Sequence, residues 1–378
     1  MSSPLRAGVN AIFLEPGMGG LETYVLELVP ALLASGESLR LTVLCNRRGR
    51  GLIERQPWAS SVELMTPRAS RRGLRALYEL GPLGGLAGRR FDVLHSPALT
   101  APLRTRAANV VVLADATWIT VPDMGRGQAA TVRLWRAVVP AIARRADRVI
   151  AISAASARDI ENHLGVRPDR IDVIPLGYAG APRTAPTREP ELRERLALGD
   201  GPIVLNVGAK KIHKNQMRLV RAMPRVREAV PGARLVLAGA ATPHERELRA
   251  EAERLGLSDS VAFPGYVASE DLEGLYAAAS VFAFPSLNEG FGLPLLEAMG
   301  RDLAIVTSSV SALPEVAGDA ALLVQPESVE EIAGAIARLL TDPELRERLT
   351  TAGRRRLERF SWERTAEQTL ASWRRAMR

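Results

Sequence analysis

Cysteine is almost absent from this sequence, because Cys45 is the single one in 378 residues. One cysteine excludes an intrachain disulfide framework and a multi-cysteine zinc site. The histidines are also few, and His95, His163, His213 and His244 do not show the spacing of metal ligands. We therefore expect no metal centre, and the cysteine count fits a reducing compartment.

Long apolar runs are missing as well. No run approaches the roughly 18 apolar residues of a membrane-spanning helix, and no apolar segment typical of a signal peptide follows the polar start, Met1–Val9. The composition, with 47% hydrophobic and 24% charged residues, is that of a soluble globular chain. We expect a cytoplasmic protein of two domains or one large α/β domain.

Lysine is nearly absent too. Among 50 basic residues only Lys210, Lys211 and Lys214 are lysine, and all the others are arginine. A compact ammonium group suits a phosphate contact where the planar guanidinium of arginine fits poorly. The cluster is therefore a candidate phosphate-binding loop, with chance or local sequence drift as the alternative.

The net charge of +8 is concentrated in the first half of the chain, where residues 1–190 hold 25 arginines and 16 acidic residues. Such a surface suits anionic lipid, nucleic acid or an anionic substrate, and a solvated surface is the alternative. The arginine-rich stretch 68–90 has leucines at helical spacing that are typical of a membrane-touching segment. Its glycines and Pro82 are expected to break any long helix, which leaves an exposed helix and loop as the alternative.

Short apolar strands alternate with amphipathic helices, as in parallel sheets buried on both faces. The first set of expected strands comprises residues 9–14, 39–45, 62–65, 91–95, 110–113, 148–152 and 171–175, with a helix over 21–33. Residues 179–202 are rich in proline and are expected to be a linker. The second set comprises strands 202–207, 234–238, 261–263, 281–284, 304–307 and 321–324, and helices 215–230, 244–255, 293–299 and 329–340.

One stretch, Glu289-Gly-Phe-Gly-Leu-Pro-Leu-Leu-Glu297, places two carboxylates around an expected helix start. Gly290 and Gly292 let a ligand approach the backbone closely, and Pro294 is favourable in a first helical turn. The amides of Phe291, Gly292 and Leu293 then lie at a helix N-terminus, which favours phosphate. One carboxylate can reach a reacting sugar, and the other can accept hydrogen bonds from ribose hydroxyls.

This stretch resembles the Glu-x7-Glu motif of retaining glycosyltransferases of family four, which have the GT-B fold. The resemblance runs nearly end to end, and its motifs are highly specific when taken together. The other matching segments are Asp147-Arg-Val-Ile-Ala-Ile-Ser153, Ile174-Pro-Leu-Gly-Tyr178, Phe263-Pro-Gly-Tyr-Val267, Leu275-Tyr-Ala-Ala-Ala279, Leu313-Pro-Glu-Val-Ala-Gly318 and Phe360-Ser-Trp362.

The resemblance implies two Rossmann-like α/β domains whose parallel sheets face each other across a cleft. Residues 1–180 would form the acceptor domain, 181–358 the nucleotide-sugar donor domain, and 359–378 a C-terminal helix that packs back on the first domain. The implied activity is retaining transfer of a mannose- or glucose-type hexose or deoxyhexose to a hydroxyl, in glycan, glycolipid or natural-product biosynthesis. Neither a cofactor nor a metal is needed, since the nucleoside diphosphate sugar is a substrate.

The implied acceptor is a small molecule, a lipid-linked molecule or a glycan, and nucleic acid is not expected as a partner. The basic first domain would give the cytoplasmic protein a peripheral contact with the inner surface of the membrane. Arginine- and alanine-rich usage indicates a bacterial source.

The resemblance also assigns donor-binding residues. Glu289 would face the transferring sugar, Glu297 would bind the ribose, and Val267 would contact the base through its backbone. Gly19 and Gly20 would approach the donor phosphate and sugar.

Lys214 would bind the donor diphosphate. Relatives usually carry a second basic residue directly after the loop glycine, where this chain has Ala209. Lys210 or Lys211 would take its place.

The acceptor side departs from the family pattern. Many relatives carry a His-Asp pair after the fourth strand, whereas this chain has Ala114-Asp115. Asp115 acting alone and His95, in Asp92-Val-Leu-His-Ser-Pro97, are the candidate catalytic residues there. A structural, hydrogen-bonded role is the alternative for His95.

Two other classes of protein stay open. A different GT-B enzyme, such as a nucleotide-sugar epimerase, would share the motifs, whereas a phosphorylase would need a lysine for pyridoxal phosphate outside the donor loop. A basic nucleic-acid-binding protein would use the first half, which shows no helix-turn-helix and no interleaving of aromatic and basic residues.

Overall fold

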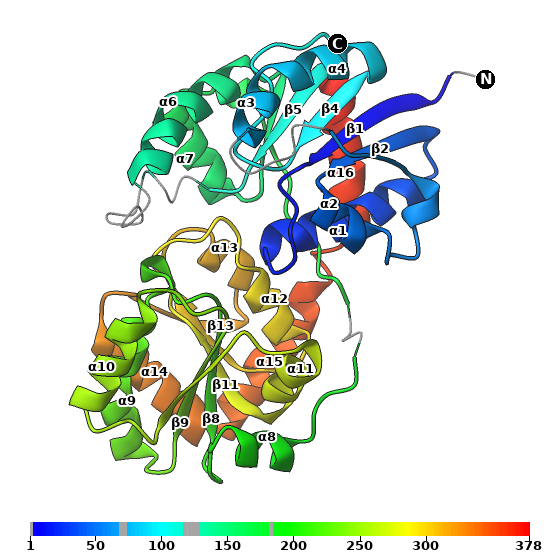
Figure 1. Ribbon diagram of the computed structural model, residues 1–378. Helices are drawn as coiled ribbons and strands as arrows, with labels where there is room; N and C mark the ends of the chain where they lie inside the picture. Colours follow the sequence, from blue (N-terminus) through cyan, green and yellow to red (C-terminus); the bar gives the residue numbers. More distant parts are fainter. Residues whose placement is uncertain (1–2, 68–73, 116–118, 120–128, 181–183) are drawn as a thin grey trace. The chain divides into compact units, whose positions relative to one another are not determined.

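The computed structural model describes residues 3–67, 74–115, 119, 129–180 and 184–378 (Figure 1). These residues form two compact units. The first unit combines the described residues up to Ala179 with Phe360–Arg378, and the second comprises the described residues of Gly180–Arg359. Each unit is described by itself.

The first unit is built on a seven-stranded parallel sheet in the order β3-β2-β1-β4-β5-β6-β7. Strand β1 begins at Leu5, four residues before the predicted start at Val9. The prediction missed its first part because Arg6 and Asn10 interrupt the apolar pattern. Arg6 pairs with Asp92 at 2.6 Å, and Asn10 is fully buried. The strands are β1 (Leu5–Ala11), β2 (Leu39–Cys45), β3 (Glu63–Met65), β4 (Val93–Ser96), β5 (Ala108–Leu113), β6 (Arg148–Ala151) and β7 (Ile171–Val173).

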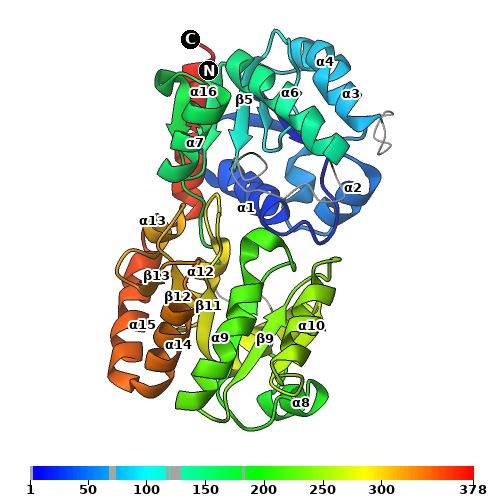
Figure 2. The same ribbon diagram turned by 90° about the vertical axis from the view of Figure 1, so that its left-hand side faces the viewer.

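The helices of the first unit cover both faces of this sheet. Right-handed connections put α1 and α2 on one face and α3, α4, α6 and α7 on the other. Figure 2 shows α3, α4 and α6 grouped on one side of the unit and α16 on the other. The helices are α1 (Gly20–Ala34), α2 (Arg47–Ile53), α3 (Arg75–Leu80), α4 (Pro82–Arg90), α6 (Ala129–Arg145), α7 (Ala154–Leu164) and α16 (Trp362–Ala376).

The C-terminal helix α16 belongs to the first unit, as predicted, and packs beside α1 (Figure 1). Asp172 on β7 anchors it, accepting a hydrogen bond from Ser372 Oγ at 2.6 Å and pairing with Arg375 at 2.8 Å. Arg148 donates to the same carboxylate at 2.9 Å. Burial alone would raise the pKa of Asp172, but the hydrogen bonds and charges of these partners have the larger effect and lower that pKa.

The glycine-rich stretch before β4 is helical, and the predicted break lies at Gly81 alone. A Cβ atom on Gly84 would lie 1.9 Å from the carbonyl oxygen of Arg104. Glycine is therefore needed at this position so that α4 can pack closely against the segment around Arg104. This packing outweighs the low helix propensity of glycine.

The second unit contains a six-stranded parallel sheet in the order β10-β9-β8-β11-β12-β13. Its strands are β8 (Ile203–Val207), β9 (Arg234–Ala238), β10 (Val261–Gly265), β11 (Ala279–Phe284), β12 (Ile305–Ser308) and β13 (Ala321–Val324). Its helices are α8 (Glu189–Arg195), α9 (Gln216–Ala229), α10 (Glu245–Arg254), α11 (Ser269–Ala278), α12 (Leu293–Met299), α13 (Leu313–Ala317), α14 (Val329–Thr341) and α15 (Pro343–Leu357). The prediction of two parallel α/β sheets is confirmed.

The expected linker over 179–202 contains α8, so the expectation of an irregular segment was wrong for that part. Pro190 lies in the first turn, where it favours a helix start. Leu192 is fully buried and packs against α11, where a Cβ atom on Gly274 would lie 2.4 Å from its side chain. One buried leucine fixes this helix in a segment that otherwise looks polar.

Candidate functional site

Three loops of the second unit leave neighbouring strands at the carboxyl edge of the sheet. They comprise residues 208–215 after β8, 285–292 after β11 and 309–312 after β12. The order of the strands reverses between β8 and β11. In open parallel sheets ligands bind outside the carboxyl edge at such a switch point.

The loops after β8 and β11 are joined by hydrogen bonds between their backbones and side chains. The amide of Leu287 donates to the carbonyl oxygen of His213 at 2.7 Å. Asn215 turns the chain into α9 with a φ of 59° and donates from Nδ2 to the Pro285 carbonyl at 2.8 Å. The lysine loop is therefore held against the Glu289 loop.

The two motifs meet in an ion pair. Lys214 Nζ lies 2.7 Å from Glu289 Oε1, and the two side chains are 17% and 13% exposed. The ammonium also lies 5.0 Å from the centre of the Phe284 ring, within range of a cation–π contact. Both charged groups retain access to solvent, so a ligand can take the place of either partner.

Ser311, from the loop after β12, fixes the backbone of Glu289. Its hydroxyl accepts from the Glu289 amide at 2.9 Å and lies 2.7 Å from Asn288 Oδ1. Ser311 has a φ of 63°, an uncommon conformation for a residue other than glycine that costs about 1–3 kcal/mol. The loop after β12 thus orients the carboxylate that pairs with Lys214.

Helix α12 begins directly after this loop. Gly292 has a φ of 112°, and a Cβ atom there would lie 2.8 Å from Leu313, so only glycine fits. Phe291 is buried, Pro294 lies in the first turn, and no side chain caps the first amides. Phe291, Gly292 and Leu293 thus lead into a helix start whose amides are suited to an anion.

Glu297 lies within α12, and its carboxylate accepts a hydrogen bond from Tyr276 at 2.9 Å. Burial raises the pKa of Glu297, while the Tyr276 hydrogen bond and the charges of Arg301 and Lys214 lower it. The charge of Lys214 thus acts on both carboxylates of the motif.

Lys210 differs from its expected placement. It is fully buried, and its ammonium donates to the carbonyl oxygen of Gly239 at 2.5 Å. Burial lowers its pKa to about 8. The side chain ties the loop after β8 to the turn after β9 and does not face a diphosphate, whereas Lys211 is exposed. Val267, partly buried, follows β10 two strands away.

His95, in the first unit, is fully buried on β4. Trp373 Nε1 donates to its Nδ1 at 3.1 Å, so Nε2 carries the proton that faces the Tyr24 hydroxyl at 3.0 Å. Burial lowers its pKa to about 3, which leaves the ring neutral. Both ring nitrogens are engaged between α1 and α16, which favours the structural alternative over the catalytic one.

The other predicted residues of the first unit lie at the carboxyl ends of β1 and β5. Gly19 is the N-cap of α1 with a φ of 62°, and Gly20 begins the helix. The amides of Gly17 and Met18 donate to Glu22 at 2.8 and 3.1 Å, which fixes this turn. Asp115 follows β5 and is partly buried.

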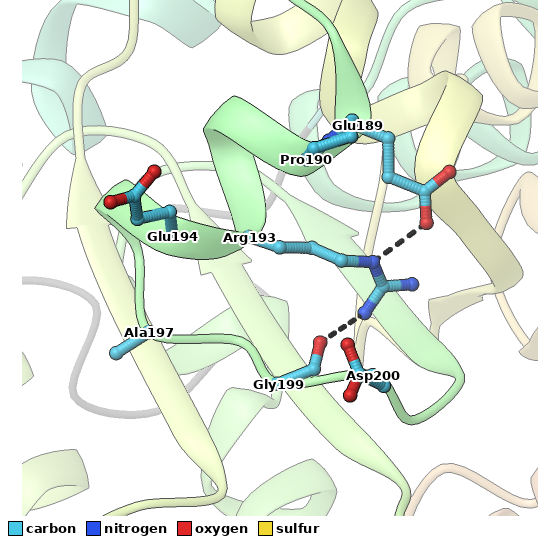
Figure 3. Close-up of a pocket in the computed structure, with 7 residues that line it drawn as sticks. All are labelled: Glu189, Pro190, Arg193, Glu194, Ala197, Gly199 and Asp200. Atoms are coloured by element: carbon cyan, nitrogen blue, oxygen red, sulfur yellow. Dashed lines mark hydrogen bonds and ion pairs between the residues drawn. The ribbon is translucent and has the colours of Figure 1, made fainter.

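A separate hollow of about 710 Å³ lies before β8, at the amino edge of the second sheet (Figure 3). Arg193 crosses it and bonds to Glu189 Oε1 at 2.6 Å and to the carbonyl oxygen of Gly199 at 2.5 Å (Figure 3). This hollow lies at the amino edge and not at the switch point on the carboxyl edge, so it is not the candidate site. Within the described residues, no group of three or more His, Cys, Asp or Glu side chains could hold a metal ion.

Sequence reasoning missed the residues that support the site. Ser311, Tyr276 and Phe284 act through contacts with residues distant in the sequence, and only Tyr276 stood in a recognised segment. Asn215 gave no such signal either, because its side chain does not cap α9 and instead donates to the carbonyls of Pro285 and Pro326.

Known proteins resemble both halves of the chain. The family described as "Glycosyl transferases group 1" matches residues 188–356, and "Glycosyltransferase Family 4" matches residues 18–179. An MMP alpha-(1->4)-mannosyltransferase of Mycolicibacterium hassiacum is 33% identical over 319 residues, covering 77% of this chain and 73% of the relative. The O-antigen chain mannosyltransferase B of Escherichia coli is 29% identical over 375 residues, covering 94% and 95%.

Solved structures show the same fold. Sucrose-phosphate synthase of Thermosynechococcus elongatus aligns with a TM-score of 0.76 at 22% identity, covering 98% of both chains. Anabaena HepE in complex with UDP and glucose aligns with a TM-score of 0.75 at 22% identity, covering 97% of this chain and 98% of that one.

The two sheets and these matches define a GT-B glycosyltransferase that uses a nucleotide sugar. The chain belongs to glycosyltransferase family 4, as its motifs predicted. The matched relatives transfer sugars, which favours transfer over the epimerase and nucleic-acid alternatives.

Proposed function

We propose that the chain transfers a hexose from a nucleoside diphosphate sugar to an acceptor hydroxyl with retention of the anomeric configuration. The observation that carries this proposal is the Lys214–Glu289 pair at 2.7 Å, at the switch point of the second sheet and beside the start of α12. Lys214 binds the diphosphate, Glu289 faces the transferring sugar, and Glu297 accepts hydrogen bonds from the ribose.

In this reaction the bond between the anomeric carbon and the diphosphate oxygen breaks, and the acceptor oxygen bonds to the same face of the sugar. The acceptor proton passes to the leaving phosphate oxygen. Negative charge grows on the diphosphate, where Lys214 and the amides of Gly292 and Leu293 at the start of α12 stabilise it. Each preorganised donor of this kind contributes about 3–4 kcal/mol in the transition state. No step needs a metal or a cofactor.

The donor is expected to be a mannose-type sugar first and a glucose-type sugar second. The two relatives described above are mannosyltransferases by name, and another related protein is described as GDP-mannose-dependent. A structural neighbour holds UDP and glucose. The acceptor is a glycan, lipid-linked or small-molecule hydroxyl, since one relative by name extends an O-antigen chain.

The donor proposal predicts that GDP or UDP raises the thermal unfolding midpoint, while the matching nucleoside monophosphate has a much smaller effect. A ligand at a hundred times its Kd stabilises the native protein by about 2.7 kcal/mol. A thermal-shift screen of GDP, UDP and ADP, each beside its monophosphate, identifies the base. The corresponding mannose and glucose donors are then tested for transfer. Absence of stabilisation by every nucleoside diphosphate would contradict the proposal.

We further propose that the first unit contacts an anionic membrane surface through α3 and α6. Leu74 and Leu77 are 53% and 66% exposed, and Leu134 on α6 is 47% exposed beside the exposed Arg133 and Arg136. Right-handed connections put both helices on one face of the sheet. Leu83 of the same arginine-rich stretch is buried, so only its first leucines face solvent. No helix in the described part of the chain is long and apolar enough to span a bilayer.

The membrane proposal predicts that the protein sediments with phosphatidylglycerol vesicles more than with phosphatidylcholine vesicles, and less at high salt. Changing Leu74 and Leu77 to serine should weaken vesicle binding at least about tenfold, because a buried leucine contributes roughly 1.5–3 kcal/mol. Leu323→Ser is the matched control, since Leu323 is 42% exposed in the second unit. Equal loss in both variants would refute this contact surface.

A further inference from the structure

Tyr276 is a buried polar side chain of the second unit that none of the roles assigned above uses. It is 1% exposed, on α11, and its hydroxyl donates to Glu297 Oε2 at 2.9 Å. Burial raises the pKa of the phenol well above its usual value, so the hydroxyl stays protonated and remains a donor. One oxygen of Glu297 is thereby held by the Tyr276 hydroxyl.

The Tyr276 ring contacts two neighbouring side chains. The Arg301 guanidinium lies 4.5 Å from its centre, and Phe282 stacks on it at 5.8 Å. Arg301 is itself fixed, since its Nε donates to Glu273 at 2.8 Å and its Nη1 donates to the Glu297 carbonyl at 2.8 Å. The phenol therefore has little freedom to leave the carboxylate.

The same aromatic stack reaches the lysine. Phe282 stacks on Phe284 at 5.9 Å, and Lys214 Nζ lies 5.0 Å from the Phe284 ring centre. The rings of Tyr276, Phe282 and Phe284 thus form one stack. The Lys214 ammonium lies at one end of this stack, and the Glu297 carboxylate lies at the other. A rigid column of this kind sets the spacing between a diphosphate contact and a ribose contact.

We propose that Tyr276 is a positioning residue of the donor site, which aims the Glu297 carboxylate at the ribose hydroxyls of the nucleotide. This inference rests on the proposed function, because it takes Glu297 as the ribose contact. Tyr276 itself does not touch the donor. Its hydrogen bond also opposes the effect of burial and favours the ionised form of Glu297, which accepts from two hydroxyls at once.

The test is isothermal titration of the full chain with GDP or UDP and with the matching 2′,3′-dideoxynucleotide. The wild type should prefer the ribonucleotide. Tyr276→Phe should weaken ribonucleotide binding roughly tenfold or more, as expected for a hydrogen bond to a charged group, and leave dideoxynucleotide binding unchanged. Tyr78→Phe, which removes a phenol hydroxyl on α3 in the first unit, should keep the preference for ribose.

The pH profile separates positioning from packing. Binding that needs the Glu297 carboxylate weakens as pH falls, and loss of the Tyr276 hydroxyl raises the pKa of Glu297 further. The acidic limb of ribonucleotide binding should therefore move to higher pH in Tyr276→Phe. In a Glu297→Gln background, Tyr276→Phe should have no further effect on the ribose preference, because its action passes through that carboxylate.

Distinct results separate the two proposals. A wild type that binds no nucleoside diphosphate would overturn the donor site itself. A wild type that prefers the ribonucleotide, with an unchanged preference and pH profile in a folded Tyr276→Phe, would overturn the role of Tyr276 alone.

Discussion

Glu289→Gln should lower turnover at least about a hundredfold while nucleoside diphosphate binding stays equal or becomes tighter. The carboxylate faces the reacting sugar, so its loss removes an interaction of the transition state that accounts for roughly 3 kcal/mol. Glu289 also holds Lys214 in an ion pair at 2.7 Å. A bound diphosphate has to displace that carboxylate from Lys214. The neutral glutamine side chain neither competes for Lys214 nor repels the diphosphate.

Opposite effects on catalysis and product binding are the signature to measure, by steady-state kinetics on the true donor and by titration with the nucleoside diphosphate. Glu330→Gln is the matched control, because Glu330 also pairs with a basic residue, Arg225 at 3.0 Å, but on an exposed surface. Exposed pairs contribute about 0–1 kcal/mol. Near-normal turnover in a folded Glu289→Gln protein would remove Glu289 from the site.

The fold was largely predictable because buried parallel strands are short apolar runs. Strands β2 and β9 have the predicted bounds, and their apolar runs are largely buried. Strand β13 and helix α12 have the predicted bounds as well, although Leu323 of β13 is 42% exposed. The errors arose where one contact outweighs composition. Leu192 fixes α8 in a proline-rich segment, and Gly84 lets α4 pack closely against Arg104.

The site was less predictable, because orientation depends on partners far away in the sequence. His95 and Trp373 are 278 positions apart, and nothing in the pattern around His95 indicates that an indole occupies its Nδ1. Lys210 and Lys214 look alike in the sequence. One ammonium meets the Gly239 carbonyl inside the unit, and the other meets Glu289 at its edge.

Lys214→Met should have the effect complementary to that of Glu289→Gln, weakening nucleoside diphosphate binding and lowering turnover together, each at least about a hundredfold. The ammonium is the point charge closest to Glu289, and it would stabilise the diphosphate in the ground state and even more as its charge grows. Lys214→Arg should restore little, since the ammonium sits over Phe284 with 17% of the side chain exposed. A larger planar guanidinium does not fit such a contact equivalently.

The double variant gives the sharpest check, because it separates charge removal from loss of fold. Lys214→Met alone leaves Glu289, 13% exposed, without its partner. The loss of stability should be smaller than the roughly 3–5 kcal/mol of a fully buried pair, because both side chains keep access to solvent. Adding Glu289→Gln removes the unpaired charge, so the thermal midpoint should recover while turnover stays low. Arg225→Met, which breaks the exposed Arg225–Glu330 pair, should change neither quantity. A double variant that regains turnover with stability would show that the pair is structural and that the diphosphate binds elsewhere.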